Sequence, residues 1–565
     1  MIFSNNIVDL KKQNMARFIF ITGGVVSSLG KGIATASIGA ILKSMGYSVF
    51  LKKLDPYLNI DPGTMNPVEH GEVFVTNDGG ECDLDLGHYE RFTGIMTSKA
   101  SNITSGKIYQ QLIQNERKGK YLGKTVQTIP HVTNLMSDFI TNNPEKADFI
   151  ICEVGGTVGD IEALPFFETI RQIRQKYKNK TMLIHLTYVP YLAPSREIKT
   201  KPTQHSVKEL MSIGLAPDAI LCRSSVHIGK ENKKKIALFC NVNEEAVFEG
   251  LDVKSIYEIP PLYLEQDMHK VILDHFGIAE ERKPNLNHFK EYTVKLQNAK
   301  KEKNKITIAV IGKYTHHADA YKSICESLEH SCVSFGKYPE IVWIDSEDFD
   351  SQAPTIDDLK GANCAIIPGG FGIRGIEGKI KWAEFLRTNN IPTLGICLGM
   401  QVMVTEFARN QLQIADACSA EWIESVPHGT GESGQIKLGT KLIDIIEQFE
   451  KDGKIEKRCN KTDLGGTMRL GLYTAEIHDK SSIAYKIYGA QFSERHRHRY
   501  EVDASYKAQF EQNGMNFSVI SQDNLPEIVE IPTHKFFIGV QFHPEFQSSF
   551  FKPSPLFQAL IASVA

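Results

Sequence analysis

Short apolar runs alternate with helical patterns along most of the chain. The first run, FIFIT at residues 18–22, is followed by a glycine-rich segment and a helical pattern that continues through Met45. Alternation of this kind across residues 17–270 is typical of an α/β domain with a parallel sheet. A second series starts with ITIAVI at residues 306–311. The sequence therefore predicts two α/β domains in succession.

The segment between the two series predicts the domain boundary. Residues 279–305 are rich in charge and poor in glycine, and residues 295–305 have the composition of a solvated helical linker. We predict a first domain at 17–284, a linker at 285–304 and a second domain at 305–565. Residues 1–16 have neither a long apolar core nor a cleavage-like pattern, so we expect a short extension compatible with disorder.

Composition narrows the classes of function. The 565 residues carry 64 basic and 67 acidic side chains, which gives a net charge of −3. This balance does not favour nucleic acid or an anionic membrane as a partner. The apolar runs are all much shorter than a membrane span. The 10 cysteines form no CxxC pair, and without a secretory signal they indicate reduced thiols and a cytoplasmic location.

A glycine-rich segment, GGVVSSLGKG at residues 23–32, joins the first predicted strand to the first predicted helix. A strand, a glycine loop and a helix N-terminus together can cradle phosphate, with Lys31 reaching the outer phosphates. The usual P-loop has glycine at position 25 and Ser or Thr at position 32, where this chain has Val25 and Gly32. The segment is a variant P-loop, and the same pattern could serve a dinucleotide or be an ordinary turn.

Carboxylates follow two further segments of the first half. Asp83 and Asp85 are two positions apart in DLDLGHYERF, and Glu153 ends the apolar run FIIC at residues 149–152. Mg²⁺ bound with a nucleotide is usually held by one or two carboxylates, phosphate oxygens and water. An acidic residue at the end of a parallel strand lies next to the ligand crevice. The alternative is a salt bridge in a loop.

One thiol of the second half lies between two glycines, in GICLG at residues 395–399. Residues 393–396 resemble the end of a buried strand and residues 400–408 a helix. A sharp turn between them would expose Cys397 at a helix N-terminus, where the helix dipole favours the thiolate. Cysteines in such surroundings are also common as plain core residues.

A histidine near the C-terminus offers a partner for this thiol. Pro544 biases His543 toward an extended backbone, so that His543 and Glu545 share one face. An imidazole that takes a thiol proton and a carboxylate that fixes its tautomer complete a Cys-His-Glu triad. The alternative is a loop histidine with a solvated glutamate.

GICLG and FHPE, in this chain order, resemble the triad of the class I glutamine amidotransferases. The resemblance implies that the thiolate attacks the glutamine side-chain amide, ammonia departs, and water releases glutamate from the thioester. Donors for the oxyanion are the N–H of Leu398 and the PGGFG loop at residues 368–372. The glutamine site implied by the resemblance comprises Gly370, Leu398, Gly399, Met400, Gln401, Glu421 and Arg499.

Longer matches precede the amidotransferase motifs. The segments GGVVSSLGKG, KLDPYLNIDPGTMNPVEHGEVFV, DLDLGHYERF, GGTVGDIE and KTKPTQHSVKEL stand in this order ahead of GICLGMQ. From about Arg17 onward the chain resembles the CTP synthase family. The resemblance implies a ligase that uses ATP and Mg²⁺ to aminate UTP to CTP through a 4-phosphorylated UTP, with ammonia from L-glutamine. It also implies inhibition by CTP, activation by GTP through a segment like residues 465–471, and a homotetramer.

The resemblance assigns nucleotide and metal sites residue by residue. Mg²⁺ is assigned to Asp85 and Glu153. ATP is assigned to Ser28, Leu29, Gly30, Lys31, Gly32, Ile33, Lys53, Asp85 and Val253. UTP and CTP are assigned to Ser27, Asp160, Ile161, Glu162, Lys199, Thr200, Lys201, Pro202, Thr203, Gln204 and Lys235. Without the resemblance, Lys199 and Lys201 would be an exposed basic turn and residues 233–235 a solvated helix face.

Two other functions stay open on the sequence. A different ATP-dependent amidotransferase, for example one that acts on a corrinoid carboxylate, would share the P-loop and the glutaminase domain. The segments KTKPTQHS and DLDLGHYERF argue against it. An inactive, filament-forming scaffold would keep the fold, but it would not need the triad residues together with Lys31, Asp85 and Glu153.

Overall fold

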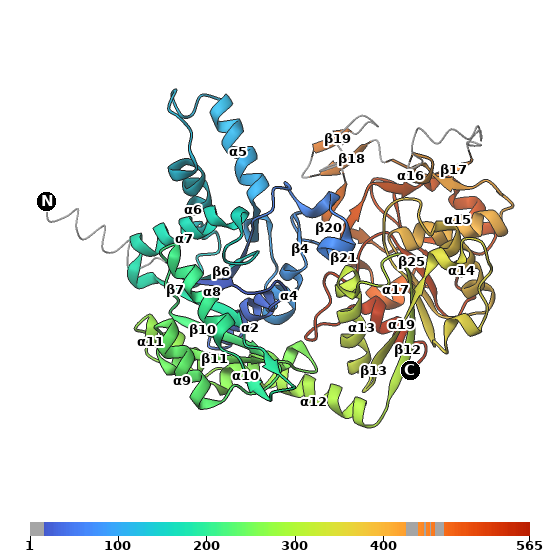
Figure 1. Cartoon of the computed structure of the whole chain (residues 1–565). Coiled ribbons are helices and arrows are strands. Elements are labelled where there is room, and N and C mark those ends of the chain that lie inside the picture. The colour runs from blue at the N-terminus through green and yellow to red at the C-terminus, as the bar shows by residue number, and fades with distance from the viewer. Residues whose placement is uncertain (1–15, 425–438, 446–447, 452–453, 458–467) are drawn as a thin grey trace. The chain divides into compact units, whose positions relative to one another are not determined.

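The computed structural model describes residues 16–424, 439–445, 448–451, 454–457 and 468–565. The chain divides into two compact units, the first made of residues up to 62 with 85–294 and the second of residues 63–84 with 295–565. Figure 1 colours the chain from blue at its N-terminus to red at its C-terminus. The predicted domain bounds stay a prediction, but residues 63–84 pack with the later part of the chain.

The first unit is built on a seven-stranded parallel sheet in the order β11-β10-β7-β1-β6-β2-β5. Nearly all strand residues are buried, as expected where helices cover both faces of a parallel sheet. The strands are β1 (Arg17–Gly23), β2 (Val49–Asp55), β5 (Asn102–Thr104), β6 (Phe149–Val154), β7 (Thr181–Tyr188), β10 (Ala219–Ser224) and β11 (Val247–Leu251), with the small hairpin β8 (Tyr191–Leu192) and β9 (Glu197–Ile198) beside them.

Helices connect these strands, since parallel neighbours need crossover connections. Alternate residues of β1 face opposite sides, and Phe18 and Phe20 belong to a core that includes residues of α5, α6 and α7. The helices are α2 (Lys31–Ser44), α4 (Asp85–Thr93), α5 (Ser105–Arg117), α6 (Thr133–Thr141), α7 (Leu164–Lys176), α8 (Lys201–Ser212), α9 (Gly229–Cys240), α10 (Ile259–Glu265) and α11 (Met268–His275). The linker helix α12 (Asn287–Lys301) begins in the first unit and ends in the second.

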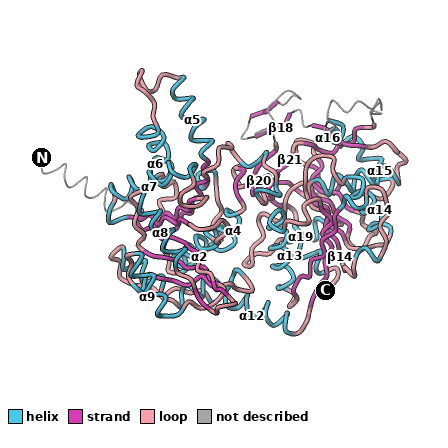
Figure 2. The backbone as a smooth tube through the Cα atoms, viewed as in Figure 1, coloured by secondary structure: helices cyan, strands magenta, loops and turns pink. Residues whose placement is uncertain are grey.

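The second unit is built on a mixed seven-stranded sheet in the order β13-β12-β14-β15-β25-β24-β23. The first five of these strands are parallel, and β24 and β23 join antiparallel at one edge. They span β12 (Lys305–Gly312), β13 (Tyr338–Asp345), β14 (Cys364–Ile367), β15 (Thr393–Ile396), β23 (Asn516–Ile520), β24 (Pro526–Glu530) and β25 (Phe537–Val540). Figure 2 shows the strands of both units in magenta among cyan helices.

Two hydrophobic clusters lie on the opposite faces of this sheet, because Ala309 and Ile311 belong to one and Ile308 and Val310 to the other. The helices are α3 (Pro67–His70), α13 (Lys322–Ser334), α14 (Ile376–Thr388), α15 (Leu398–Asn410), α16 (Ala420–Glu424), α17 (Ile483–Tyr488), α18 (Lys507–Gln512) and α19 (Pro555–Ala562). The smaller sheets comprise β3 (Val73–Val75) with β4 (Glu81–Asp83), β16 (Cys418–Ser419) with β17 (Lys441–Ile445) and β22 (Tyr500–Val502), β18 (Gln448–Lys451) with β19 (Lys454–Lys457), and β20 (Arg469–Glu476) with β21 (Gln491–His498).

The strands predicted at 18–22, 149–152, 306–311, 364–367 and 393–396 lie within β1, β6, β12, β14 and β15. The predicted helical linker is wrong at its end: α12 stops at Lys301, and Lys305 already belongs to β12. Residues 1–15 and 465–467 of the predicted segments lie outside the described residues. Among the helices that the structure describes, none is long and apolar enough to cross a membrane.

Candidate active sites

The glycine loop of the first unit connects β1 to α2, as the sequence predicts. Gly30 precedes the helix with φ 87°, and Val25 has φ 83°. A positive φ is strained for a β-branched residue. Val25 therefore keeps the backbone conformation that glycine adopts easily, at the position where the usual P-loop has glycine.

The glycine at position 32 is explained by the carboxylate next to it. A Cβ atom on Gly32 would lie 1.8 Å from Oδ1 of Asp85, far inside van der Waals contact. The first turn of α2 and the first residue of α4 are therefore packed directly together. Asp85 takes the place beside the loop where the Ser or Thr hydroxyl of the usual pattern would lie.

A buried cluster of charges joins the ends of β2 and β6 to α4. The ammonium of Lys53 forms ion pairs with Asp85 and with Glu153, whose Oε1 is 2.9 Å from Nζ. Tyr89 donates a hydrogen bond to Glu153 Oε2. Asp83, the other acidic candidate, belongs to β4 in the second unit. The sequence thus predicts Lys53, Asp85 and Glu153 together but misses Tyr89.

Burial sets the ionisation of this cluster. It raises the pKa of Glu153 to about 7, helped by the negative charge of Asp85. Burial alone would also raise the pKa of Asp85, but Lys53 and His88 outweigh it and lower that pKa. The pKa of Lys31 is lowered, chiefly by burial, and its Nζ donates to the Gly156 carbonyl at 2.6 Å. A bound cation beside Glu153, in addition to the Lys53 ammonium, would offset the cost of burying the Glu153 carboxylate.

These carboxylates fit a magnesium ion that shares its coordination with a nucleotide. Their oxygens are the ligands Mg²⁺ prefers, and it usually keeps phosphate and water in its shell. Among the described residues, no three His, Cys, Asp or Glu side chains form a group that could hold a metal by themselves. Asp85 and Glu153 would therefore need further ligands, such as phosphate oxygens and water, to hold the ion.

A cavity of about 160 Å³ lies beside the glycine loop, at the ends of β7, β10 and β11. Its size suits part of a nucleotide, and it collects residues from distant parts of the chain. Five of the predicted ATP residues line it: Ser28, Leu29, Gly30, Ile33 and Val253. The sequence analysis missed Arg223 and Tyr263, which also line it and add a guanidinium and a phenol to its wall. Arg223 stands near the end of an apolar strand, which is the signal that could have found it.

A second cavity of the first unit, about 480 Å³, contains Lys201 and Pro202 of the predicted UTP site, and also His205 and Ser206, which were missed. The other predicted UTP residues are not among those that line it. The side chains of Thr200, Thr203 and Gln204 are buried, and Thr203 shares a hydrogen bond with Thr187. Exposed positions are Ser27, Asp160, Ile161, Glu162, Lys199 and Lys235.

In the second unit Cys397 stands on the predicted sharp turn. It follows β15, precedes α15, and has φ 53° and ψ −107°. A non-glycine residue in such a conformation costs about 1–3 kcal/mol, which the surrounding structure must supply. Both flanking glycines are needed: a Cβ at Gly395 would lie 2.3 Å from Met403 Sδ, and one at Gly399 would lie 1.9 Å from the Ile367 carbonyl oxygen.

His543 and Glu545 complete the triad geometry. His543 Nδ1 is 2.7 Å from Glu545 Oε1, and its ring stacks on Phe546 with centroids 4.9 Å apart. His543 Nε2 is buried and has no hydrogen-bond partner in the described part of the chain. Burial lowers the pKa of His543, but the charges of Glu545 and Cys397 outweigh it and raise the pKa to about 10. A Cβ at Gly369 would lie 3.1 Å from the His543 ring and 3.6 Å from Cys397 Cβ.

Two buried lysines hold the PGGFG loop. Lys313 Nζ donates to the Phe371 and Gly372 carbonyls at 2.8 and 2.6 Å, and Lys379 Nζ donates to the Pro368 carbonyl at 3.0 Å. Burial lowers the pKa of Lys313 to about 8. The sequence analysis missed both lysines, because a single lysine after a strand or in a helix is usually exposed.

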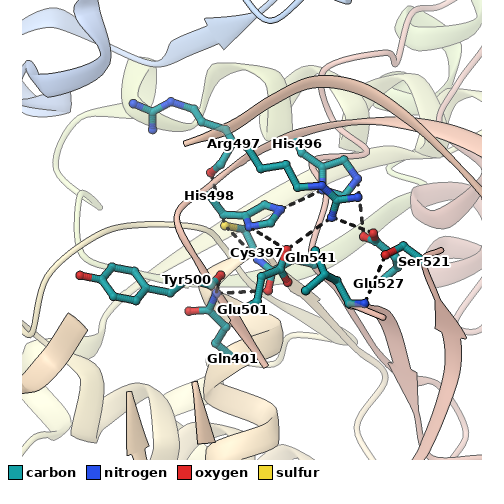
Figure 3. Close-up of polar contacts among 12 residues, drawn as sticks. Cys397, Gln401, His496, Arg497, His498, Tyr500, Glu501, Ser521, Glu527 and Gln541 are labelled. Atoms are coloured by element: carbon teal, nitrogen blue, oxygen red, sulfur yellow. Dashed lines mark hydrogen bonds and ion pairs between the residues drawn. The ribbon is translucent and has the colours of Figure 1, made fainter. Parts of the chain in front are cut away.

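Two of the residues predicted for the glutamine site, Glu421 and Leu398, lie next to this loop. Glu421 accepts a hydrogen bond from the Gly372 N–H at 2.8 Å, and a Cβ at Gly370 would lie 3.4 Å from Leu398. Gly399 and Met400 are in the first turn of α15, and Arg499 is half-buried between β21 and β22. Gln401 is 3% exposed, and its amide contacts Tyr500 and Gln541 (Figure 3).

Comparisons with known proteins match both halves of the chain. The family model "CTP synthase N-terminus" matches residues 17–278, and "Glutamine amidotransferase class-I" matches residues 316–563. A CTP synthase of Cereibacter sphaeroides is 51% identical over 545 residues, covering 96% of this chain and 97% of its own. One of Pelagibacter ubique is 52% identical over 550 residues, covering 97% and 99%.

The chain belongs to the CTP synthase family. A CTP synthase is a ligase that aminates UTP to CTP with ATP and the nitrogen of glutamine, so the predicted fold class and activity are confirmed. A solved glutaminase domain of Trypanosoma brucei CTPS with bound acivicin is 34% identical, covers 46% of this chain and 93% of its own, and has a TM-score of 0.39. Membership of the CTP synthase family sets aside the corrinoid-type amidotransferase and the inactive scaffold.

Proposed function

We propose that Cys397, His543 and Glu545 of the second unit hydrolyse glutamine, while the first unit activates UTP with ATP. The observation that carries this assignment is the strained Cys397 turn beside His543, whose Nδ1 is 2.7 Å from Glu545. A histidine held in one tautomer by a carboxylate is the base that a thiol nucleophile needs.

The chemistry then proceeds in two steps. His543 takes the thiol proton, the thiolate adds to the amide carbon, and the N–H groups of Leu398 and Gly370 bind the oxyanion. His543 returns the proton to the departing nitrogen, which leaves as ammonia, and a thioester remains. His543 next takes a proton from water, the hydroxide attacks the thioester, and glutamate is released as the thiol regains its proton. The charges of Glu545 and of the Cys397 thiolate, which raise the pKa of His543, stabilise the imidazolium formed in the first step, and Glu545 stabilises the one formed in the second.

The ends of the glutamine bind around the nucleophile. Glu421 holds the amino group, and Arg499 holds the carboxylate. Gly399 and Met400 follow Cys397 in the first turn of α15, where the first N–H groups of a helix lack partners within the helix, and Gln401 comes next. Support comes from Glu421 on the Gly372 N–H, which fixes that carboxylate next to the glycine loop.

In the first unit, Lys31 and Lys53 neutralise the phosphoryl group that passes from ATP to O4 of UTP. Asp85 and Glu153 would hold Mg²⁺, which when bound neutralises charge on the phosphate oxygens. O4 of uracil is a poor leaving group, and phosphorylation lets ammonia displace it as phosphate. Support comes from the buried Lys53 cluster and from the cavity lined by Ser28, Gly30 and Val253.

The remaining assignments follow the family. UTP binds at Ser27, residues 160–162, residues 199–204 and Lys235, and CTP inhibits by overlapping the triphosphate part of that site. GTP activates glutamine hydrolysis through residues 465–471, of which 465–467 lie outside the described residues. The enzyme acts in the cytoplasm as a homotetramer.

The proposal is tested by measuring CTP from UTP, ATP and Mg²⁺ with either glutamine or ammonium chloride. Cys397→Ala should abolish synthesis from glutamine and leave synthesis from ammonium largely intact, because only the source of ammonia is lost. Lys31→Ala should fail with both nitrogen sources and still hydrolyse glutamine. Equal loss with both sources in Cys397→Ala, or full activity in Lys31→Ala, would contradict the assignment.

A further inference from the structure

Two buried glutamine side chains lie behind the nucleophile (Figure 3). Gln541 follows β25 and has no exposed surface, and its Nε2 is 3.6 Å from Cys397 Sγ. Gln401, in α15, approaches Gln541 Oε1 with its own Nε2 at 3.2 Å. The same Nε2 is 3.0 Å from the backbone carbonyl of Tyr500. The contacts form one chain from Tyr500 through both amides to the sulfur.

The Tyr500 carbonyl sets the direction of this chain. A carbonyl oxygen only accepts hydrogen bonds, so Gln401 must turn its NH₂ group toward it. That NH₂ group also faces the Gln541 amide, which must therefore present its acceptor atom, Oε1. The NH₂ group of Gln541 is then left to face Cys397. The backbone N–H of Gln541 is held as well, by the Glu527 carbonyl at 2.9 Å.

The sulfur has a second polar neighbour of the opposite kind. The Arg497 carbonyl is 3.7 Å from Cys397 Sγ and can only accept, so it suits the thiol. The Gln541 amide donates, so it suits the thiolate, because hydrogen bonds to a charged form favour that form. The two contacts together fix the place of the sulfur in both protonation states.

We propose that Gln541 is a further catalytic residue, which donates to the Cys397 thiolate, and that Gln401 is a positioning residue that holds the Gln541 amide in the donating orientation. The inference rests on the proposed nucleophilic role of Cys397. It gives the Gln401 side chain a task other than binding substrate, since its NH₂ group already has two acceptors.

Other charged groups face the same sulfur and stay unchanged in the variants below. His543, with Glu545 behind it, lies on the segment after β25, and Lys379 lies on α14, where its charge interacts with Cys397. The electrostatic effect of these groups on Cys397 is therefore the same in the parent and in the variants, so a shift in the pH midpoint of alkylation comes from the removed amide.

The test uses the full-length enzyme and the rate at which iodoacetamide alkylates Cys397, followed by peptide mass spectrometry across a range of pH. Gln541→Leu removes the donor and keeps the volume similar. We expect alkylation about tenfold slower at neutral pH and its pH midpoint about one unit higher, equivalent to ~1.4 kcal/mol. Gln401→Met should shift the midpoint in the same direction by less. In both, kcat for glutamine hydrolysis should fall while KM changes less than about twofold.

Gln558→Leu is the matched control, since Gln558 lies on α19 and contacts Ser334 instead of the thiol. Calorimetric unfolding of the second unit, compared with the parent, reports whether each variant is folded, and if Gln541→Leu is not, Gln401→Met decides. An unchanged pH midpoint in a folded variant overturns the proposal, and so does a rise in KM alone. Failure of the nucleophile assignment itself would appear separately, as glutamine-dependent synthesis that survives Cys397→Ala.

Discussion

At the scale of single residues, the position of the Asp85 carboxylate depends on the absence of a side chain at Gly32. The 1.8 Å separation between a Cβ at position 32 and Asp85 Oδ1 leaves no room for one. The departure from the usual P-loop is thus a requirement of this site. In the same loop Val25 has φ 83°, so backbone strain is tolerated at a position where no neighbouring atom excludes the side chain.

Gly32→Ala should therefore displace Asp85 and disrupt its pair with Lys53. We expect CTP synthesis from ammonium to fall by about a hundredfold, because misplacing a charge at a phosphoryl-transfer site is costly. Gly39→Ala, in the same helix, is the matched control, since its Cβ would meet only side-chain atoms, at 3.2 Å or more. Similar rates in the two variants would contradict this explanation of Gly32.

Glu153 predicts a dependence of stability on pH. The folded protein keeps the Glu153 proton up to about pH 7, whereas the unfolded chain loses it near its ordinary value of 4.5. The folded state binds more protons in this window, so Glu153 reduces stability as the pH rises through it. Glu153→Gln should raise the unfolding free energy of the ligand-free protein by roughly 1–3 kcal/mol above about pH 7.

Calorimetry across pH checks this expectation, with the exposed Glu145→Gln as control. The difference between Glu153→Gln and the parent should vanish below the unfolded value of 4.5. ATP with Mg²⁺ should stabilise the parent and not Glu153→Gln, which should also make no CTP. A variant less stable than the parent at high pH would mean that the Lys53 and Tyr89 contacts outweigh burial.

At the scale of elements, the nucleophile turn depends on how closely α15 approaches β14. A Cβ at Gly399 would lie 1.9 Å from the backbone oxygen of Ile367, and backbone cannot move aside as a side chain can. The PGGFG loop is also fixed by other elements, because Lys313 and Lys379 donate hydrogen bonds to its carbonyls. The site is therefore shaped by contacts between elements more than by the triad side chains themselves.

Gly399→Ala should push α15 away from β14 and move Cys397 with it. We expect a loss of roughly 1–3 kcal/mol in the stability of the second unit, the usual cost of overpacking. Glutamine hydrolysis should drop by more than about a hundredfold, while CTP synthesis from ammonium persists. Calorimetry and the two nitrogen sources measure both effects, and a variant that hydrolyses glutamine normally would refute the tight packing.

The sequence predicted the elements well where pattern and chemistry coincide. The apolar runs at residues 18–22 and 393–396 lie in β1 and β15, and the glycine-flanked Cys397 lies on the turn predicted for it. Lys313 and Lys379 could not be predicted, because burial of a lysine depends on distant carbonyls that composition does not reveal. Gln541 could not be predicted for a related reason, since its partners Cys397, Gln401 and Glu527 come from the turn after β15, from α15 and from β24.

At the scale of the whole molecule, the second unit includes residues 63–84, far from it in sequence. Arg495 has no exposed surface and donates to Asn77 and to the Val75 carbonyl, while Phe74 packs edge-on against Phe546, the residue that stacks on His543. The short apolar run of β3 (Val73–Val75) does not indicate which sheet or unit buries it.

A fragment of residues 305–565 alone should therefore be a poor glutaminase. Without residues 63–84 it exposes Arg495 and Phe546, so we expect a lower thermal midpoint and at least about tenfold weaker glutamine hydrolysis than the full chain. A synthetic peptide of residues 63–84 should restore part of both, and the same peptide with Phe74→Ala should restore less. Full activity of the fragment alone would show that residues 63–84 are dispensable for glutamine hydrolysis.

The inclusion of residues 63–84 in the second unit also determines whether a single cut in the backbone separates the two units. The chain passes between the two units near residues 62, 84 and 294, so the linker helix is one of three covalent connections. A protease that cuts α12 would give two polypeptides, yet the first would still contribute a hairpin to the fold of the second. The nicked enzyme should therefore run as two bands in denaturing gels. In native gels it should run as one particle, because the two fragments still fold together, as in a split protein.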